Sequence, residues 1–291
     1  MGSAGEVVQA YVATQVERLL AAVPGVRDGD DGAVHDARVA TRRLRAALSV
    51  YRSVLDREVT DPVRAELAEL GHVLGTARDA YVEGHALRRR LAREDPALIV
   101  GPVERRIDED RSAARLLAQD GVDAWLASAR FAELVATLAR DLPTGPGASG
   151  EATRVLPRRA RRAWHRLDRA LEAAADAPAG DDRDEALHEV RKAARRARYA
   201  SEVAAAVVGA PARRSAKRAH RVQEVLGTQH DAVTRQETLR RLAHQADLDG
   251  ESTFTYGRLH ALEQIAGEAA SDAAVTPLRR VARRGHRRWM R

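Results

Sequence analysis

The stretch AVHDARVATRRLRAALSVYRSVL, residues 33–55, combines helical spacing with an unusual distribution of charge. It holds five arginines and one histidine, and after Asp36 no acidic residue follows before Asp56. Apolar residues recur at three- and four-residue intervals, which predicts an amphipathic helix. Most soluble helices mix acids among the bases of their exposed face. An acid-free basic face therefore raises the question of what neutralises it.

The basic residues fall on one side of this predicted helix. With about 100° of rotation per residue, Arg38, Arg42 and Arg45 lie within about 80° of His35 on one side. Arg43 lies about 80° away on the other side of the histidine. The opposite face is apolar and carries Ala40, Leu44 and Leu48. The helix is expected to bury this apolar back and to present a cationic front.

The second half of the chain repeats the pattern. The stretch ALHEVRKAARRARYASEV, residues 186–203, has bases 3, 7, 8 and 10 residues after His188, the same offsets as after His35. The four bases of this second copy are Arg191, Arg195, Arg196 and Arg198. Codon bias can enrich a chain in arginine, but it does not readily place a histidine and four arginines at the same offsets twice.

A second pair of matching segments supports the repeat. HVLGTARDA, residues 72–80, aligns with EVLGTQHDA, residues 224–232. Asp79 lies 44 residues after His35, and Asp231 lies 43 residues after His188. We therefore expect two homologous halves, residues 1–141 and 151–291, joined by a linker at 142–150. Four helices is the natural number for each half.

The remaining pattern predicts a chain that is nearly all helix. Proline and glycine cluster in 23–32, 142–150 and 176–182, which predicts loops there. The segments between them have helical spacing, and no convincing alternating strand is present. We expect about eight to ten helices in total.

The overall charge points to a polyanionic partner. The net charge is +7 and the isoelectric point is about 10.4. All but two of the 49 basic residues are arginines, the exceptions being Lys192 and Lys217. The planar guanidinium suits phosphate oxygens. Nucleic acid, anionic lipid and polymeric phosphate are the partner classes that this charge favours.

Other features narrow the class of protein. The sequence has no cysteine, which excludes disulfides and thiolate metal sites and suits a reducing, cytoplasmic environment. No run approaches the roughly 18 apolar residues of a membrane span. The first residues lack the basic start and apolar run of a signal peptide.

The basic helices need a counter-charge. Arginines three or four residues apart repel each other by some tenths of a kcal/mol per pair. An external anion would neutralise them, and that is the interpretation we favour. The alternative is an internal acid on a neighbouring helix, for which the first half offers Asp36, Glu66, Glu69 and Asp79.

The two histidines are expected to contact the same anion. His35 and His188 recur at the same place in both halves, beside the arginines, and a protonated histidine donates from both ring nitrogens. A capping or core role is the alternative for each. Metal ligation with Asp79 or Asp231 is disfavoured, because the arginines would repel a cation and no HExxH-type pair is present. These two aspartates are instead expected to hold an arginine or histidine of their own half.

A third basic segment could extend the surface. RRSAKRAHR, residues 213–221, places cations at helical spacing. We include three of them among the candidate binding residues: Lys217, Arg218 and Arg221. A solvated helix face explains this segment about as well.

The doubled motif His-x-x-Arg-x-x-x-Arg-Arg-x-Arg, each copy followed by Leu-Gly-x-x-x-Asp, resembles the CHAD family, the conserved histidine α-helical domain. The resemblance covers nearly the whole chain. It implies an all-α fold of two pseudo-symmetric four-helix bundles packed around a basic central cavity. It also implies binding of inorganic polyphosphate and targeting to polyphosphate granules. One departure is Lys192, which stands where the first copy has Val39, so the two halves are expected to contribute unequally.

The sequence therefore predicts a polyphosphate-binding protein with no catalytic residues, no cofactor and no metal. The candidate binding residues are His35, Arg38, Arg42, Arg43, Arg45, His188, Arg191, Lys192, Arg195, Arg196, Arg198, Lys217, Arg218 and Arg221. A module that binds nucleic acid or an acidic protein is the main alternative. Scarce aromatics argue against single-stranded nucleic acid. A metal-dependent polyphosphate hydrolase is disfavoured, since the motifs lack clustered carboxylates and an activated nucleophile.

Overall fold

The computed structural model describes residues 2–178, 180–281 and 284–291. Within these ranges the chain forms nine α-helices and two 3₁₀ helices, and its only β-type pairings are two isolated bridges. The expected all-α class is confirmed. None of the described helices is long and apolar enough to cross a membrane.

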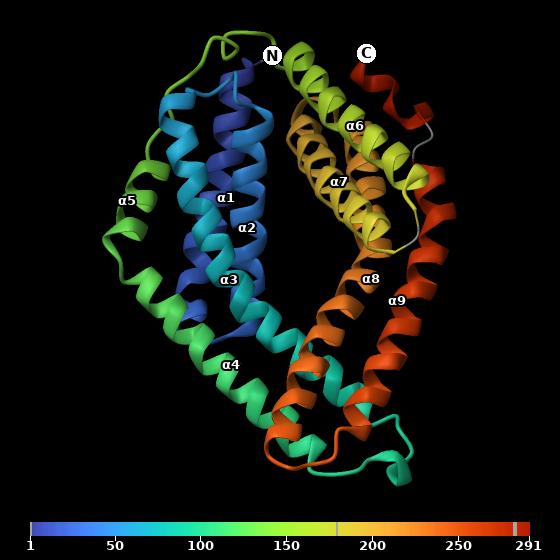
Figure 1. Cartoon of the computed structure of the whole chain (residues 1–291). Coiled ribbons are helices and arrows are strands. Elements are labelled where there is room, and N and C mark those ends of the chain that lie inside the picture. The colour runs from blue at the N-terminus through green and yellow to red at the C-terminus, as the bar shows by residue number, and fades with distance from the viewer. Residues whose placement is uncertain (1, 179, 282–283) are drawn as a thin grey trace.

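The helices fall into two groups along the chain (Figure 1). The first group is α1 (Ala4–Arg27), α2 (Asp31–Val50), α3 (Arg57–Leu91), η1 (Pro96–Leu98), α4 (Val103–Leu126) and α5 (Ala129–Leu138). The second group is α6 (Ala152–Asp176), α7 (Asp181–Val208), α8 (Ala210–Leu248), α9 (Phe254–Val281) and η2 (Arg284–Met290). The first group thus holds the short helix α5 beyond the four that the sequence predicts. The bundle symmetry and the domain boundaries stay predictions.

Two predicted element boundaries are wrong. The expected loop 23–32 is mostly helical, because α1 continues through Pro24 to Arg27 and α2 begins at Asp31. The missing amide of Pro24 interrupts only one hydrogen bond, and the helix turns continue around it. The stretch 33–55 is also not one helix, since α2 ends at Val50 and a turn covers 51–54.

The segment 142–150 contains no helix and closes the end of the molecule where the chain begins. The backbone amides of Ala4 and Gly5 donate to the carbonyls of Gly150 and Ala148, at 2.8 and 2.9 Å. Figure 1 shows this segment passing over the tops of the helices near the N-terminus.

The apolar back of α2 lies in the main hydrophobic core, as its spacing predicts. Ala40, Leu44 and Leu48 are buried, and their cluster joins residues of α1, α3, α6 and α7. The buried Tyr51 hydroxyl, just past the end of α2, donates to the carbonyl of Ala200 in α7 at 2.8 Å. Because the core and this bond hold α2 against α7, the basic faces of the two helices are held side by side.

The long helices α3 and α8 meet again at the other end of the molecule. In Figure 1, α3 leaves the first group and runs toward α8 and α9. There a separate apolar cluster joins Leu87 and Ile107 with Leu239, Leu242 and Tyr256. We call this region, where α3 and α4 pack against α8 and α9, the distal end.

Candidate polyanion-binding site

The local fold of α2 sets the direction of its basic residues. Asp30 caps the helix, and its carboxylate accepts a hydrogen bond from the Ala33 amide at 2.7 Å. An aspartate at this position satisfies one of the free amides of the first turn. The cap fixes the start of α2 just before His35, so that Arg42 and the following bases project toward α7 and α3.

A cationic pocket lies between α2, α3 and α7. Its volume is about 290 Å³, and no acidic residue is among the described residues that line it. Six of its lining residues are cationic: Arg42 and Arg45 from α2, Arg64 from α3, and Lys192, Arg195 and Arg196 from α7. The small residues Ala46 and Ser49 complete the wall. We refer to this opening as the α3-side mouth.

Arg195 carries the least compensated charge of the pocket. Burial, followed by the positive charge of Arg42, lowers the pKa of the Arg195 guanidinium to about 10. Arg191 and Arg38 act in the same direction. The Nε of Arg42 is buried and has no hydrogen-bond partner. Two facing arginines are therefore held in a partly desolvated place with unused hydrogen-bonding capacity, which an anion would satisfy.

The same imbalance extends to the rim of the pocket. Burial and the charge of Arg64 lower the pKa of Arg45, against the opposing charge of Glu69. Burial also lowers the pKa of Arg191, while Asp231 raises it and Arg38 lowers it further. The cations of the three helices thus repel one another across the pocket.

Arg38 has an internal partner, as the sequence suggested for Asp79. Its Nη1 donates to Asp79 Oδ1 at 2.7 Å and to the carbonyl of Gly75 at 3.3 Å. A Cβ atom on Gly75 would lie 3.8 Å from Arg38 Cζ, an ordinary van der Waals distance, so the guanidinium packs directly on the α3 backbone there. Helix α3 continues through Gly75, which excludes a helix-end role for that residue.

Two further predicted site residues are held by a carboxylate. Glu202 of α7 accepts from Arg43 Nε at 3.0 Å and from Arg198 Nε at 2.8 Å. The Glu202 side chain is only 20% exposed. Arg198 Nη1 also lies 2.9 Å from His220 Nδ1 of α8. The structure brings Arg43 and Arg198 together at Glu202 rather than in the pocket.

Both motif histidines, His35 and His188, are exposed and lie near arginines of the motifs. Burial of the ring, then the charges of Arg78 and Arg42, lower the pKa of His35. Burial and the charge of Lys192 lower the pKa of His188. In the protein without ligand both rings therefore hold their protons less tightly than a free histidine does.

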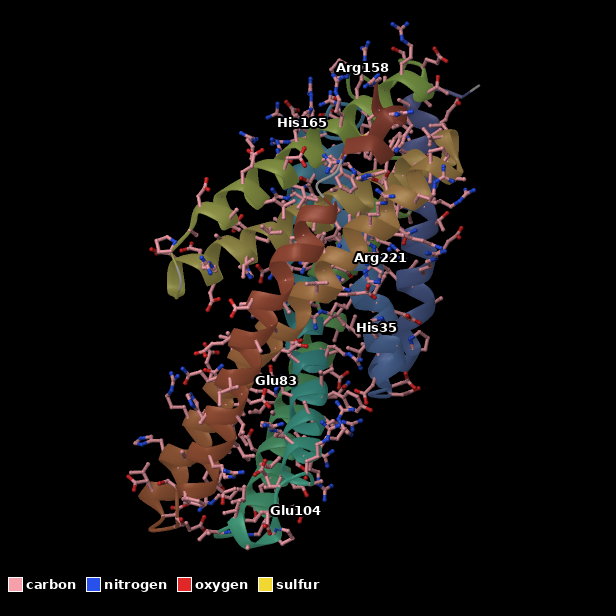
Figure 2. The ribbon with its side chains drawn as sticks, turned by 90° about the vertical axis from the view of Figure 1, so that its right-hand side faces the viewer. His35, Glu83, Glu104, Arg158, His165 and Arg221 are labelled. Carbon is pink, nitrogen blue, oxygen red and sulfur yellow. The ribbon has the colours of Figure 1, made fainter. Side chains whose placement is uncertain are left out.

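The candidates on α8 lie apart from the pocket. Lys217 and Arg221 are exposed, Arg218 is half-buried, and none of them is among the lining residues of the α3-side mouth. Figure 2 shows Arg221 and His35 in the middle of the molecule, between the end with Arg158 and the distal end with Glu104. Their assignment to binding stays a prediction.

Sequence reasoning missed three residues that shape the site. Arg64 comes from α3, outside both motifs, and only the tertiary packing brings it to the pocket. Ser49 lines the same pocket as an uncharged residue. Glu202 is the first acid after Glu189 in the second copy, and the position of this acid was the one available signal.

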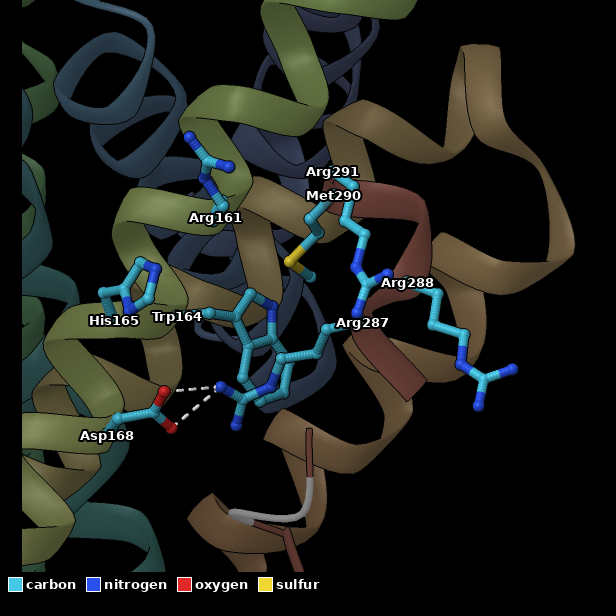
Figure 3. A pocket seen from close by; sticks show the side chains of 8 residues that line it. All are labelled: Arg161, Trp164, His165, Asp168, Arg287, Arg288, Met290 and Arg291. Atoms are coloured by element: carbon cyan, nitrogen blue, oxygen red, sulfur yellow. Dashed lines mark hydrogen bonds and ion pairs between the residues drawn. The ribbon is translucent and has the colours of Figure 1, made fainter. Parts of the chain in front are cut away.

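A second pocket contains an arginine whose charge an internal acid neutralises (Figure 3). It lies between α6 and η2 and has a volume of about 160 Å³. Arg287 Nη1 donates to both carboxylate oxygens of Asp168, at 2.7 and 2.8 Å, and its Cζ lies 4.2 Å from the centre of the Trp164 ring. Its central cation has an internal counter-charge, unlike Arg195.

Donor groups for a metal ion do not gather in the described part of the chain. No three His, Asp or Glu side chains there approach in a way that could hold a metal ion. The chemistry that the pocket offers is multidentate hydrogen bonding and charge neutralisation of an anion.

Comparison with known proteins assigns the family. The CHAD domain family matches residues 10–240. The chain belongs to this family. The match confirms the resemblance seen in the doubled histidine–arginine motif. It spans both motif-bearing helices and most of α8.

The chain also matches curated proteins over most of its length. Uncharacterized proteins from two strains of Mycobacterium tuberculosis are 36% identical over 281 residues, which is 94% of this chain. The chain spans about half the length of these curated relatives, since the match covers 53% of each.

Two solved structures share the fold. The CHAD domain of the plant Ricinus communis superposes with a TM-score of 0.72 at 27% identity, covering 96% of this chain and 92% of that one. PptA from Streptomyces chartreusis superposes with a TM-score of 0.76 at 24% identity, covering 96% and 100% of the two chains.

Proposed function

We propose that this CHAD domain binds inorganic polyphosphate in the α3-side mouth, associates through it with polyphosphate granules, and carries out no chemistry on the polymer. The observation that carries the proposal is the pair Arg42 and Arg195. These two side chains face each other from different helices without a carboxylate between them, and an anion is the missing partner.

The size of the pocket and the distribution of its cations support binding of a linear polymer. Its cations come from three helices and line a volume of about 290 Å³, which exceeds the needs of a single small anion. A chain with one charge on every phosphate can meet these cations in sequence. Because guanidinium groups bind phosphate oxygens through two parallel hydrogen bonds, the arginines add geometry to the charge.

The same pocket suits nucleic acid less well. Single-stranded nucleic acid is usually held by stacking of bases on aromatic side chains as well as by charge. The described lining residues of the mouth are arginines, a lysine, an alanine and a serine. This lining recognises phosphates and offers no surface for a base.

The proposal is tested by titrating the protein with long-chain polyphosphate at several salt concentrations. Four of the lining cations, Arg42, Arg45, Arg195 and Arg196, form no ion pair with an acid of the described residues. Neutralising about four cations should lower the logarithm of the association constant by roughly 3 for a tenfold rise in salt. Affinity that does not change between low salt and about 0.5 M would contradict an electrostatic site.

Two controls separate the alternatives. Single-stranded DNA and RNA, matched in phosphate concentration, should compete poorly with polyphosphate; equal competition would favour a nucleic-acid module. Long-chain polyphosphate incubated with the protein and Mg²⁺ or Mn²⁺ should keep its chain length, and shortening would show a hydrolase.

A further inference from the structure

The two copies of the motif build unequal surroundings for the central arginines. Arg42 and Arg195 occupy matching positions, each 7 residues after the histidine of its copy. The residues that line the α3-side mouth can therefore be compared one by one with their counterparts in the other copy. Those counterparts would line a second mouth, on the α8 side of the same two arginines.

The first difference is the replacement of a hydroxyl by a carboxylate. Ser49 and Glu202 both lie 14 residues after the histidine of their copy. Ser49 lines the open pocket. Glu202 instead accepts hydrogen bonds from Arg43 and Arg198, at 3.0 and 2.8 Å. On the α8 side, two arginines thus already have an anion.

The second difference is the replacement of a methyl group by a ring. Ala46 and Tyr199 both lie 11 residues after the histidine of their copy. Ala46 leaves space in the wall of the open pocket. Tyr199 is buried, and the Arg198 guanidinium lies 5.4 Å from the centre of its ring. The larger side chain leaves less space at this position than the methyl group of Ala46 does.

The third difference is the loss of two cations. Lys192 lines the open pocket, and its counterpart in the first copy is Val39. Arg64 also lines the pocket, and its counterpart is Ala216, since each lies 15 residues before the aspartate of its copy. At these two positions the α8 side therefore lacks cations that the α3 side has, although Lys192 pairs with Glu189 at 2.6 Å and Arg64 with Asp61 at 2.9 Å.

We infer that polyphosphate reaches the central arginines from the α3 side only, and that Glu202 acts as a built-in counter-anion that closes the α8 side. This inference rests on the proposed function. The Glu202 carboxylate is part of the chain and is therefore present beside Arg43 and Arg198 at any ligand concentration. A phosphate group would have to displace it from surroundings that are largely desolvated. The ligand therefore binds by a segment inserted from one side rather than by threading between the helices.

Closing the open mouth is the first arm of the test. Ser49→Glu places in the first copy the carboxylate that the second copy has, and we expect it to weaken polyphosphate binding at least tenfold. Ser112→Glu is the matched control, because Ser112 is exposed on α4 and the substitution changes the net charge equally. We expect it to weaken binding less than threefold.

Opening the closed side is the second arm. Glu202→Ser should free Arg43 and Arg198, strengthen binding, and make the salt dependence steeper by about 1 to 1.5 logarithmic units per tenfold change in salt. Glu104→Ser is the matched control, since it removes an exposed carboxylate from the distal end (Figure 2). Glu202→Gln replaces Glu202→Ser if thermal melting shows that the serine variant does not fold.

The outcomes separate the inference from the function on which it rests. If the unaltered protein does not bind polyphosphate, the proposed function fails and the inference falls with it. If the unaltered protein binds but Ser49→Glu behaves like Ser112→Glu, the inference is overturned together with the assignment of binding to the α3-side mouth, while polyphosphate binding by the protein stands. A steeper salt dependence for Glu202→Ser, with no such change for Glu104→Ser, supports one-sided access.

Discussion

Arginines are concentrated both at the α2–α7 contact and at the distal end, but the pKa values of Arg195 and Arg241, one from each region, shift in opposite directions. At the distal end, Arg241 of α8 donates to both oxygens of Asp110 in α4, at 2.6 and 2.9 Å. That hydrogen bonding raises the pKa of Arg241. At the α2–α7 contact, burial and neighbouring cations lower the pKa of Arg195.

The distal end repeats this pairing in several places. Its arginines form ion pairs with acids of neighbouring helices and of the segments that connect those helices. The pairs are Arg88 with Glu104, Arg106 with Asp249 and Glu251, Arg235 with Glu263, and Arg258 with Glu94. These contacts hold α3, α4, α8 and α9 together and use the arginines as structural cations.

The difference teaches how to separate function from composition. An arginine-rich sequence does not itself indicate an anion site, because most of the distal arginines have acids of their own. What marks the α2–α7 contact is the facing pair Arg42 and Arg195, which forms no ion pair with an acid of the described residues. Other cations of the same contact are paired, since Lys192 lies 2.6 Å from Glu189 and Arg64 lies 2.9 Å from Asp61. Repulsion within the facing pair lowers the stability of the unliganded protein, and binding of an anion relieves it.

The largest effect is expected from removing the unpaired arginines. Arg42→Ala combined with Arg195→Ala deletes the facing pair at the centre of the mouth. We expect the affinity for polyphosphate to fall by about 100-fold or more, since charge-assisted hydrogen bonds contribute roughly 1.5–3 kcal/mol each. Isothermal titration calorimetry measures the loss, and circular dichroism checks that the helix content persists.

The matched control removes two paired arginines. Arg88→Ala combined with Arg241→Ala lowers the net charge by the same amount at the distal end, where both side chains form ion pairs. We expect this variant to melt at a lower temperature and to bind polyphosphate nearly as well as the unaltered protein. An equal loss of binding in the two double variants would mean that total charge, rather than the α2–α7 contact, determines affinity.

A smaller effect is expected from pH. The pKa values of His35 and His188 lie below the ordinary value of 6.5 in the unliganded protein. The charged groups around the two rings are Arg78, Arg42, Arg38 and Asp36 for the first, and Lys192, Glu189, Arg191 and Arg195 for the second.

A bound polyanion raises both pKa values, so binding takes up protons. Affinity should therefore rise as the pH falls from 8 toward 5.5, by up to about tenfold for each unit of pKa shift at each histidine. His35→Gln with His188→Gln should flatten the profile. Calorimetry in buffers with different ionisation enthalpies counts the protons, and proton release on binding would show that the sign is wrong.

Much of the fold could be predicted from the sequence. The apolar spacing identified the buried face of α2, and the doubled motif identified the family and the all-α class. The ends of the helices were harder to predict from the sequence, because tertiary packing can override the preference of proline and glycine for loops. Pro24 and Gly25 suggest a loop, yet α1 continues to Arg27, where Val26 is buried in the core.

The site could be predicted only in part. The offsets of the motif identified Arg42 and Arg195, which the structure places in one pocket. They could not show that Arg43 and Arg198 share Glu202, because that contact depends on how α2 crosses α7. Arg64 was equally invisible, since no pattern along α3 distinguishes it from the exposed bases of other helices.

The central claim is that the unpaired cations of the α2–α7 contact meet the polymer and the paired distal cations do not. The most direct test is to record the Nε–Hε NMR signals of assigned arginines during titration with polyphosphate. We predict large shifts for Arg42, Arg45, Arg195 and Arg196, and unchanged signals for Arg106, Arg241 and Arg258. Shifts of equal size in both regions, or shifts confined to the distal end, would contradict the account.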